Sequence, residues 1–218
     1  MRQFFISLGL LIKNQLLPAA VGSLLAVGSA QAQSGNALNF DGENDYVGQS
    51  IGQRPGGAPT DFTFEAWLDY RENGAWTRVI DFGTGTDDNM FLTPHNGDSG
   101  TPRFAITTSG RNGEELISGT TMLSDGWHHL AVTLSQNGSG VTGTLYVDGA
   151  VAGTNTKMTL TLASLGPVTN LYLGRSQYND PYLKGSLDEV RFYAVALTQA
   201  QVQADMNMST NSIPSELL

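Results

Sequence analysis

Apolar and polar residues alternate along several short stretches of the chain, as expected of β-strands with one buried face. In the stretch FTFEAWL, residues 62–68, the side chains at positions 62, 64, 66 and 68 are apolar and share one face. Residues 127–135 alternate in the same way and place His128 and His129 on opposite faces. Further strand-like runs are predicted at residues 78–82, 90–93, 103–108, 142–147, 150–155, 171–173 and 187–193.

Turn signals and one helix signal complete this pattern. Gly, Asn, Asp and Pro residues separate the predicted strands roughly every 8 to 12 residues, a spacing typical of β-sandwiches. The pair Asp148-Gly149 predicts a two-residue hairpin turn, because both residue types tolerate positive φ. Residues 198–206 predict a short helix that Thr198 can cap. The fold is therefore expected to be an all-β sandwich with one short C-terminal helix.

The first 32 residues have the pattern of a secretory signal peptide. Arg2 precedes two apolar runs, residues 4–12 and 16–27, and the small-residue sequence Ser29-Ala30-Gln31-Ala32 follows them. Neither run reaches the roughly 20 residues that a transmembrane helix needs. We predict cleavage after Ala32, no membrane span in the mature form, and a secreted or periplasmic location. An uncleaved membrane anchor is the alternative.

The rest of the chain is expected to form one domain. Residues 33–206 carry all the predicted strands and the helix, with no internal repeat or linker, and residues 207–218 are expected to be a loose tail. A chain of this size buries about 70% of its unfolded surface, which suffices for one core. The sequence contains no cysteine, which excludes a disulfide framework and thiolate metal sites.

The charge balance excludes one class of partner. The chain has 11 Lys and Arg residues against 20 Asp and Glu residues, for a formal net charge of -9. A nucleic-acid-binding protein needs a basic face that displaces counterions from phosphates. Nucleic acid is therefore not expected among the partners.

Six short segments stand in a recognisable order along the mature chain. They are ALNFDG with DYV (37–42 and 45–47), FTFEAWL (62–68), GWHHLAVT (126–133), LYVDG (145–149), LYLG (171–174) and KGSLDEVRFY (184–193). Together they resemble the laminin-G-like domains of the concanavalin A-like lectin/glucanase superfamily. The resemblance implies a jelly-roll sandwich of two antiparallel sheets, one of them concave. That fold carries lectins, glucanases, lyases and structural modules, so function must be argued from a site.

Catalytic motifs of the related enzymes are missing from the sequence. The related β-glucanases use an E-x-D-x-x-E run on one strand, and here Glu65 and Asp69 have no third carboxylate between them. The Q-x-H pattern of the related alginate lyases and the G-x-S-x-G nucleophile elbow are also absent. We therefore expect no enzymatic activity, with a glycoside hydrolase or polysaccharide lyase as the less favoured reading.

Asp188 is the sharpest candidate for a metal ligand. It shares the strand phase of the apolar Val190 and Phe192, and an acid on a buried face needs a partner to offset desolvation. In the related glucanases the matching Asp binds a structural calcium ion together with backbone carbonyls near the chain start. The resemblance thus implies Ca²⁺ at Asp188, with ligands from the segments around Asp41 and Asp61. The alternative is that Asp188 pairs with Arg191 or with backbone amides.

Two loops combine aromatic rings with polar groups, as sugar-binding faces do. The first ends at Trp76, and the second contains Tyr178, Asn179, Asp180 and Tyr182. We expect a secreted, non-catalytic recognition module that binds a polysaccharide or glycoconjugate through these residues and holds a structural calcium ion. The alternative is a protein-interaction or extracellular-matrix module without sugar specificity, in which these aromatic residues only close the edge of the sandwich.

Overall fold

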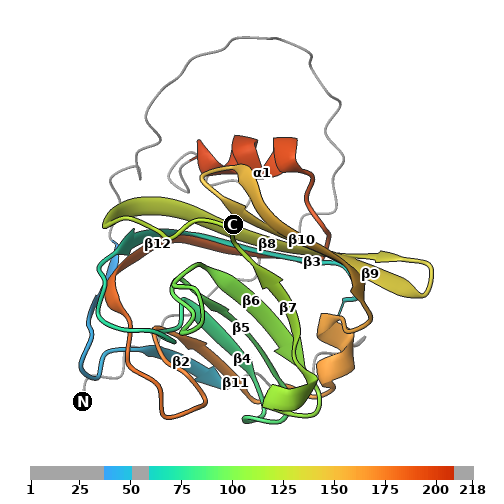
Figure 1. Ribbon diagram of the computed structural model, residues 1–218, viewed down its shortest axis with the longest axis horizontal. Helices are drawn as coiled ribbons and strands as arrows, with labels where there is room; N and C mark the ends of the chain where they lie inside the picture. Colours follow the sequence, from blue (N-terminus) through green and yellow to red (C-terminus); the bar gives the residue numbers. More distant parts are fainter. Residues whose placement is uncertain (1–36, 51–58, 209–218) are drawn as a thin grey trace, which may run out of the picture.

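Two antiparallel six-stranded sheets lie face to face in the computed structural model, which describes residues 37–50 and 59–208 (Figure 1). In spatial order, sheet A contains β1 (Leu38–Asp41), β12 (Lys184–Tyr193), β3 (Phe62–Tyr70), β8 (Gly126–Asn137), β9 (Gly140–Val147) and β10 (Ala150–Met158). Sheet B contains β2 (Val47–Ser50), β11 (Asn170–Leu173), β4 (Ile80–Gly83), β5 (Asn89–Thr93), β6 (Arg103–Thr107) and β7 (Glu115–Ser118). Two 3₁₀ turns, Arg111–Gly113 and Leu162–Leu165, and the helix α1 (Gln199–Met206) complete the described elements. The expected two-sheet sandwich with one C-terminal helix is confirmed.

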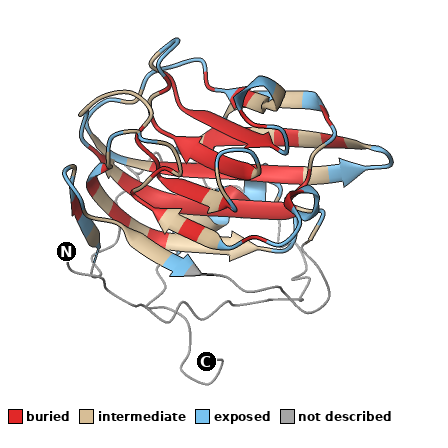
Figure 2. Ribbon diagram, turned by 90° about the horizontal axis from the view of Figure 1, so that it is seen from below, coloured by how far each residue is buried: buried red, intermediate tan, exposed pale blue. Residues whose placement is uncertain are grey.

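The core lies between the two sheets. Phe64, Ala66 and Leu68 of β3 have no exposed surface, and Phe64 and Ala66 stand opposite Val132 and Leu130 of β8. Buried residues follow the middle strands, and exposed residues gather in the connecting loops and hairpins (Figure 2). The alternation predicted for residues 62–68 and 127–135 is therefore confirmed, because every second side chain on these strands enters the core.

The hairpin between β9 and β10 turns at the predicted pair. Asp148 and Gly149 both have positive φ, 51° and 73°. Two successive positive φ values are what a type I′ turn needs, and that turn matches the right-handed twist of the paired strands.

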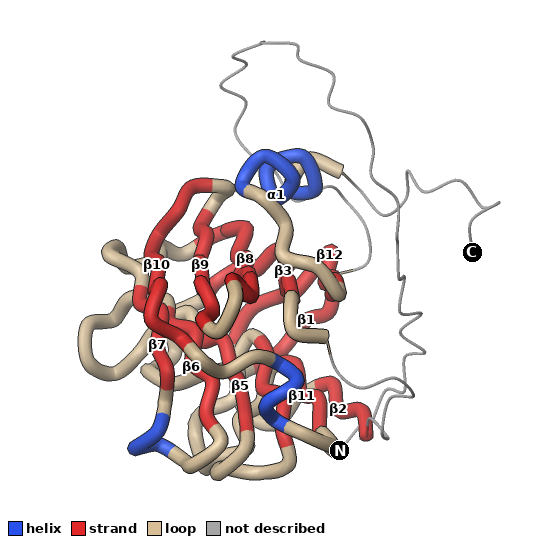
Figure 3. The backbone as a smooth tube through the Cα atoms, turned by 90° about the vertical axis from the view of Figure 1, so that its right-hand side faces the viewer, coloured by secondary structure: helices blue, strands red, loops and turns tan. Residues whose placement is uncertain are grey.

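Helix α1 lies on the outer side of sheet A, away from sheet B (Figures 1 and 3). Thr198 caps its first turn and accepts a hydrogen bond from the Gln201 backbone amide. Val202 has no exposed surface and packs against Ala131 and Tyr146 of sheet A. The predicted helix is confirmed, and its position closes one outer face of the sandwich.

A β-bulge in β12 moves Asp188 to a different face from the expected one. The register with β3 runs from Asp188 opposite Trp67 to Arg191 opposite Glu65, so β12 carries one extra residue at this point. Glu189, inside the bulge, has φ of 50°. Asp188 shares the outer face of sheet A with Trp67, whereas Val190 and Phe192 pack against the core. The prediction that Asp188 shares their buried phase is wrong, because the inserted residue reverses the alternation.

Some sequence predictions concern residues outside the described ranges. The signal peptide at residues 1–32 lies outside them, as does most of the tail at 207–218, so the boundaries of the 33–206 domain stay predictions. In the part of the chain that the structure describes, no helix is long and apolar enough to cross a membrane.

Candidate functional site

The outer face of sheet B is the candidate site, since no helix covers it in the described structure (Figures 1 and 3). The strand register places Tyr172, Asp81, Phe91, Ala105 and Leu116 side by side in one row across the sheet. Side chains opposite one another in neighbouring strands project to the same face. The row therefore forms the floor of this face, and loops from both ends of the sheet add polar groups to it.

A buried ion-pair network occupies the centre of the face. The Arg78 side chain is only 2% exposed, and its guanidinium lies 3.9 Å from the centre of the Phe91 ring. Its Nη2 is 2.8 Å from Asp180 Oδ2, and its Nε is 3.6 Å from Asp81 Oδ2. Burial lowers the pKa of Arg78 and raises that of Asp81, while the attraction between the two opposes both shifts. Because each charge is compensated by the others, the network holds the loops in one arrangement.

The loop after β11 is fixed to this network by its own hydrogen bonds. The Gln177 backbone amide and Nε2 donate to the two carboxylate oxygens of Asp81 over 2.9 and 2.8 Å. Ser176 Oγ donates to Asp180 Oδ2 over 2.9 Å, and the Tyr178 amide donates to Ser176 Oγ. The Tyr178 hydroxyl donates to the carbonyl of Thr86 over 2.8 Å, and burial raises its pKa. Tyr178 and Asp180 are therefore held in place rather than free to move.

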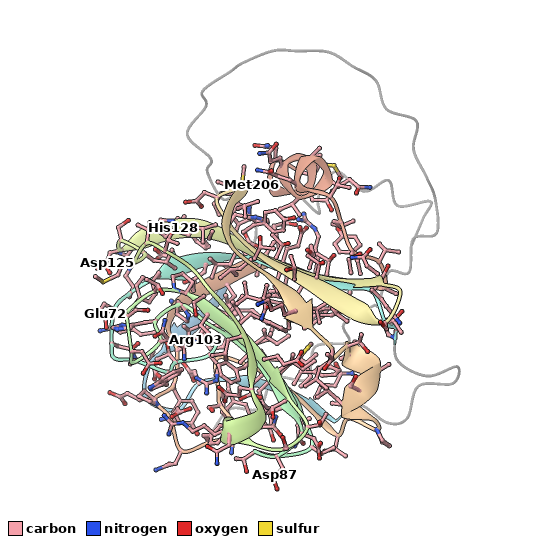
Figure 4. All side chains as sticks on the ribbon, turned by 45° about the vertical axis from the view of Figure 1, so that its right-hand side comes forward. Glu72, Asp87, Arg103, Asp125, His128 and Met206 are labelled. Atoms are coloured by element: carbon pink, nitrogen blue, oxygen red, sulfur yellow. The ribbon has the colours of Figure 1, made fainter. Side chains whose placement is uncertain are left out.

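Trp76 stands beside this network on a second loop. Its φ of 69° is unusual for a non-glycine residue, and its amide donates to the carbonyl of His95 over 2.8 Å. A Cβ at Gly97 would lie 2.4 Å from Trp76 Nε1, so glycine is required for the indole to lie against this loop. The guanidinium of Arg103 lies 5.4 Å from the Trp76 ring, within the range of a cation–π contact (Arg103 is labelled in Figure 4). Trp76 as a whole residue is half-buried.

The predicted ligand-binding residues separate into two groups. Trp76 and Asp180 meet at Arg78, which donates to the Trp76 carbonyl and binds the Asp180 carboxylate. Asn179 is exposed in the same loop as Asp180. Tyr182 lies apart from the network, with its ring centre 6.2 Å from that of Tyr46.

Four residues of this face were not predicted from the sequence: Arg78, Asp81, Phe91 and Arg103. A signal for the first two was available, because two opposite charges stand in the otherwise apolar stretch RVIDF at positions 78–82. A charged side chain inside a buried strand needs a partner, so this pair could have been chosen.

The three carboxylates proposed for calcium do not come together. Asp41 stands opposite Lys184, four residues from Asp188 along β12, which corresponds to about 13 Å. Asp61 directly precedes β3, and Trp67 of β3 is the register partner of Asp188. The six residues from Asp61 to Trp67 correspond to about 20 Å along the strand. Within residues 37–50 and 59–208, no three His, Asp or Glu side chains are grouped as metal ligands. One ion shared by these three acids therefore does not fit the structure.

Asp188 is bonded to a backbone amide and not to a charged side chain within the described ranges. It accepts a 2.8 Å hydrogen bond from the Glu189 amide, and burial raises its pKa. In the described ranges no Arg, Lys or His nitrogen forms an ion pair with it, because Arg191 binds Glu65 and Glu189 instead. The alternative Asp188–Arg191 pair is therefore not formed, and the backbone-amide alternative is present.

Ser124, His128 and Asp148 form a hydrogen-bonded chain at the edge of sheet A (His128 is labelled in Figure 4). His128 Nδ1 is 2.8 Å from Asp148 Oδ2, and Nε2 is 3.2 Å from Ser124 Oγ. Nε2 is also 3.1 Å from the Ser124 backbone carbonyl, which only accepts hydrogen bonds. The bond to Asp148 raises the pKa of His128. The Ser124 carbonyl only accepts, so a bond from Nε2 to it needs a proton on Nε2 and leaves that nitrogen no lone pair for the serine proton. The three residues link the loop before β8 to the β9–β10 hairpin.

The sequence and the fold agree with one superfamily. The family model Laminin_G_3, described as the concanavalin A-like lectin/glucanases superfamily, matches residues 41–203. The chain belongs to this superfamily as a laminin-G-like domain. No curated protein matches the sequence.

Several solved structures share the fold of this laminin-G-like domain. Domain 4 of AbnA, a GH43 extracellular arabinanase from Geobacillus stearothermophilus in complex with arabinotriose, is 22% identical, with a TM-score of 0.62 over 80% of this chain and 78% of that one. The CBM40 of the Ruminococcus gnavus IT-sialidase, bound to α2,3 sialyllactose, is 15% identical. Its TM-score is 0.61, and the match covers 78% of this chain and 96% of that one. Domains LG4-5 of the mouse laminin α1 chain are 16% identical. Their TM-score is 0.53, and the match covers 84% of this chain and 48% of that one. At these identities the similarity establishes the fold alone.

Proposed function

We propose that this laminin-G-like domain is a secreted or periplasmic, non-catalytic module that binds carbohydrate on the outer face of sheet B. One observation carries the proposal: this face holds a half-buried Trp76 beside a rigid network of Arg78, Asp81 and Asp180, whereas α1 closes the opposite face. Aromatic surface with a few fixed polar groups is the usual composition of a sugar site. Two structural neighbours are carbohydrate-binding domains with sugars bound, which supports the same choice.

A recognition role fits the carboxylates of this face better than catalysis does. A glycosidase needs two carboxyl groups that both reach the scissile bond, one of them able to deliver a proton. Asp81 has no exposed surface, and its oxygens are engaged by Gln177 and Arg78, so it cannot contact a sugar. One Asp180 oxygen accepts hydrogen bonds from both Arg78 and Ser176. These acids serve to hold the loops in place.

Replacing Trp76 with alanine is expected to weaken glycan binding by tenfold or more, because a stacked ring near the centre of a site often contributes about 2 kcal/mol. Affinity would be measured on a glycan array and then by calorimetry with the strongest ligand. Trp127→Ala is the matched control, since Trp127 is 36% exposed but stands on sheet A. Equal losses in both variants, with unchanged melting temperatures, would contradict a site on sheet B.

A protein-interaction module is the second candidate function. Met122 and Val151 are 67% and 51% exposed, and both line a depression of about 330 Å³ beside the β9–β10 hairpin. Exposed apolar side chains grouped in this way are typical of contacts with other proteins. Binding of a matrix protein that is lost in Met122→Ser, with no glycan bound by the wild type, would favour this alternative.

Structural calcium at Asp188 is proposed separately, with the remaining ligands supplied by backbone carbonyls. An ion that binds only the folded state stabilises it by roughly 2.7 kcal/mol at a hundredfold excess over Kd. EDTA is then expected to lower the melting temperature by about 5–10 °C, and added Ca²⁺ to restore it. Asp188→Asn should remove this response. A wild-type melting curve that neither EDTA nor Ca²⁺ changes would reject the ion.

A further inference from the structure

Three tyrosines surround Arg175 at the β2–β11 side of sheet B. The Arg175 guanidinium lies 4.8 Å from the centre of the Tyr46 ring and 4.9 Å from that of Tyr172. Tyr46 is in edge contact with Tyr172 at 5.9 Å and in tilted contact with Tyr182 at 6.2 Å. All four side chains are partly exposed. We refer to them as the tyrosine–arginine cluster.

Arg175 differs from the other buried or half-buried arginines in having no ion-paired acid within the described ranges. Arg78, Arg103 and Arg191 each have a carboxylate oxygen within 3.2 Å. Within the described ranges, no Asp or Glu forms an ion pair with Arg175, and its guanidinium donates no hydrogen bond to the protein. The guanidinium contacts two tyrosine rings that also contact each other. Its N–H groups have no acceptor among the described residues, so they remain to bind a ligand.

The tyrosine hydroxyls of the cluster also lack the protein partners that other tyrosine hydroxyls have. Elsewhere in the chain, the hydroxyls of Tyr70, Tyr178 and Tyr193 donate to protein oxygens. Those of Tyr46, Tyr172 and Tyr182 make no hydrogen bond to any described protein group. Three hydroxyls and one guanidinium without protein partners therefore stand together on a frame of packed rings.

The surrounding backbone holds this frame in place. A Cβ on Gly48 would lie 3.0 Å from Tyr46 Cε2 and 3.5 Å from Tyr172, so a glycine in β2 lets both rings lie close to the strand. The Tyr182 carbonyl accepts a 2.9 Å hydrogen bond from Asn73 Nδ2. The rings are thus ordered before any ligand arrives, which lowers the entropic cost of binding.

We propose that the tyrosine–arginine cluster is a subsite for a sugar that carries a carboxylate. The planar edge of a guanidinium binds a carboxylate through two parallel hydrogen bonds. The tyrosine rings and hydroxyls would contact the sugar ring that bears this group. Tyr172 stands directly opposite Asp81 in the register, so the subsite continues the face described above.

The charges around the cluster favour an acidic sugar over a bare anion. Asp45 precedes Tyr46 in the chain, and Asp81 stands opposite Tyr172 on the neighbouring strand β4. Asp81 is already paired with Arg78, so Asp45 is the acid that opposes an anion with no other contact, and ring contacts must supply the remaining affinity. This inference rests on the proposed function, since it assigns a ligand class to part of the same sugar-binding face.

The test is binding of acidic and neutral sugars to the full mature chain. Trigalacturonate, a mannuronate trimer and 3′-sialyllactose would be titrated by calorimetry, with galactotriose, mannotriose and lactose as their respective uncharged counterparts. We expect at least one acidic sugar to bind tenfold or more tightly than its counterpart, and Arg175→Gln to abolish that preference. Arg175→Lys keeps the charge without the planar edge and should lose most of the preference too. Arg111→Gln removes an exposed arginine that has no ion pair in the described structure, and it should change nothing.

Each outcome separates this inference from the proposed function. If neutral sugars bind in a Trp76-dependent manner and acidic sugars bind no better, the carboxylate subsite is rejected and the sugar-binding face stands. If Arg111→Gln reduces the preference as much as Arg175→Gln, long-range charge explains it and the subsite is again rejected. If no sugar of either kind binds, both the subsite and the sugar-binding role are overturned. The melting temperature of Arg175→Gln, measured in parallel, must stay near that of the wild type for a loss of binding to count in favour of the subsite.

Discussion

Arg78→Met is expected to lower the free energy of unfolding by about 3–5 kcal/mol. The methionine keeps the apolar contact with Phe91, but Asp81 is left without exposed surface and without its cation. For a domain of this size, the loss corresponds to a fall in melting temperature of roughly 6–20 °C. Because Asp180 loses the same partner, the Arg78→Met protein should also bind glycan more weakly.

A double variant separates the charge effect from loss of packing. In Arg78→Met/Asp81→Asn no buried carboxylate remains unpaired, so much of the lost stability should return. Urea denaturation of the wild type, both single variants and the double variant would give the coupling energy. Arg111→Met is the surface control and should change stability by less than about 0.5 kcal/mol. A double variant no more stable than Arg78→Met would argue against a charge-compensating role for Arg78.

The second large effect is expected at Arg191, which joins sheet A to the end of α1. Its Nη1 donates to Glu65 Oε1 over 3.2 Å, and its Nη2 donates to Glu189 and to the Met208 carbonyl over 2.6 Å. A bond from Nη1 to the Asp205 carbonyl adds a second link to the helix. Loss of this side chain therefore leaves the fully buried Glu65 without its cation and loosens the helix at the same time.

The cost of Arg191→Met should depend on pH. Burial raises the pKa of Glu65 to about 7; the charge of Asp205 adds to this shift, and Arg191 opposes it. Because this pKa is raised above the unfolded value, the stabilisation from Glu65 is full below about pH 4.5 and is lost as pH rises through about 7. Without Arg191 the carboxylate is costlier still, so we expect a loss of about 3–5 kcal/mol at pH 8 and about 2 kcal/mol at pH 5.

His129 is the other titratable group in contact with Glu65, 4.0 Å away, and burial lowers its pKa to about 4. Its own contribution therefore has the opposite sign: stabilisation is full above about pH 6.5 and is lost as pH falls towards 4. The charge of Arg191 adds to the lowering of the His129 pKa, so Arg191→Met should raise that pKa and the His129 trend cancels only in part between the two proteins. Arg191→Met/Glu65→Gln should be more stable than Arg191→Met at pH 8. A loss that is the same at pH 5 and pH 8 would mean that Glu65 is not the group responsible.

The candidate site could be predicted from the sequence only in part. The mixture of aromatic and polar residues in two loops pointed to Trp76, Tyr178 and Asp180, which lie on one face of sheet B. The partner that joins them, Arg78, was missed because it lies 102 residues from Asp180 along the chain. No periodicity or turn rule relates positions that far apart, so the contact depends on which strands become neighbours.

Local rules determined much of this fold from the sequence alone. Period-two alternation identified the core side of β3 and β8, the positive-φ tolerance of Asp148 and Gly149 set a hairpin, and Thr198 began the helix. Each of these features depends on backbone geometry within a few residues, so the local sequence is enough to predict it. Only the tertiary structure decided that Asp188 faces outward and that Asp41 and Asp61 lie far from it. The inserted residue in β12 is visible only against its partner strand, because a bulge is a property of a pair of strands and not of one of them.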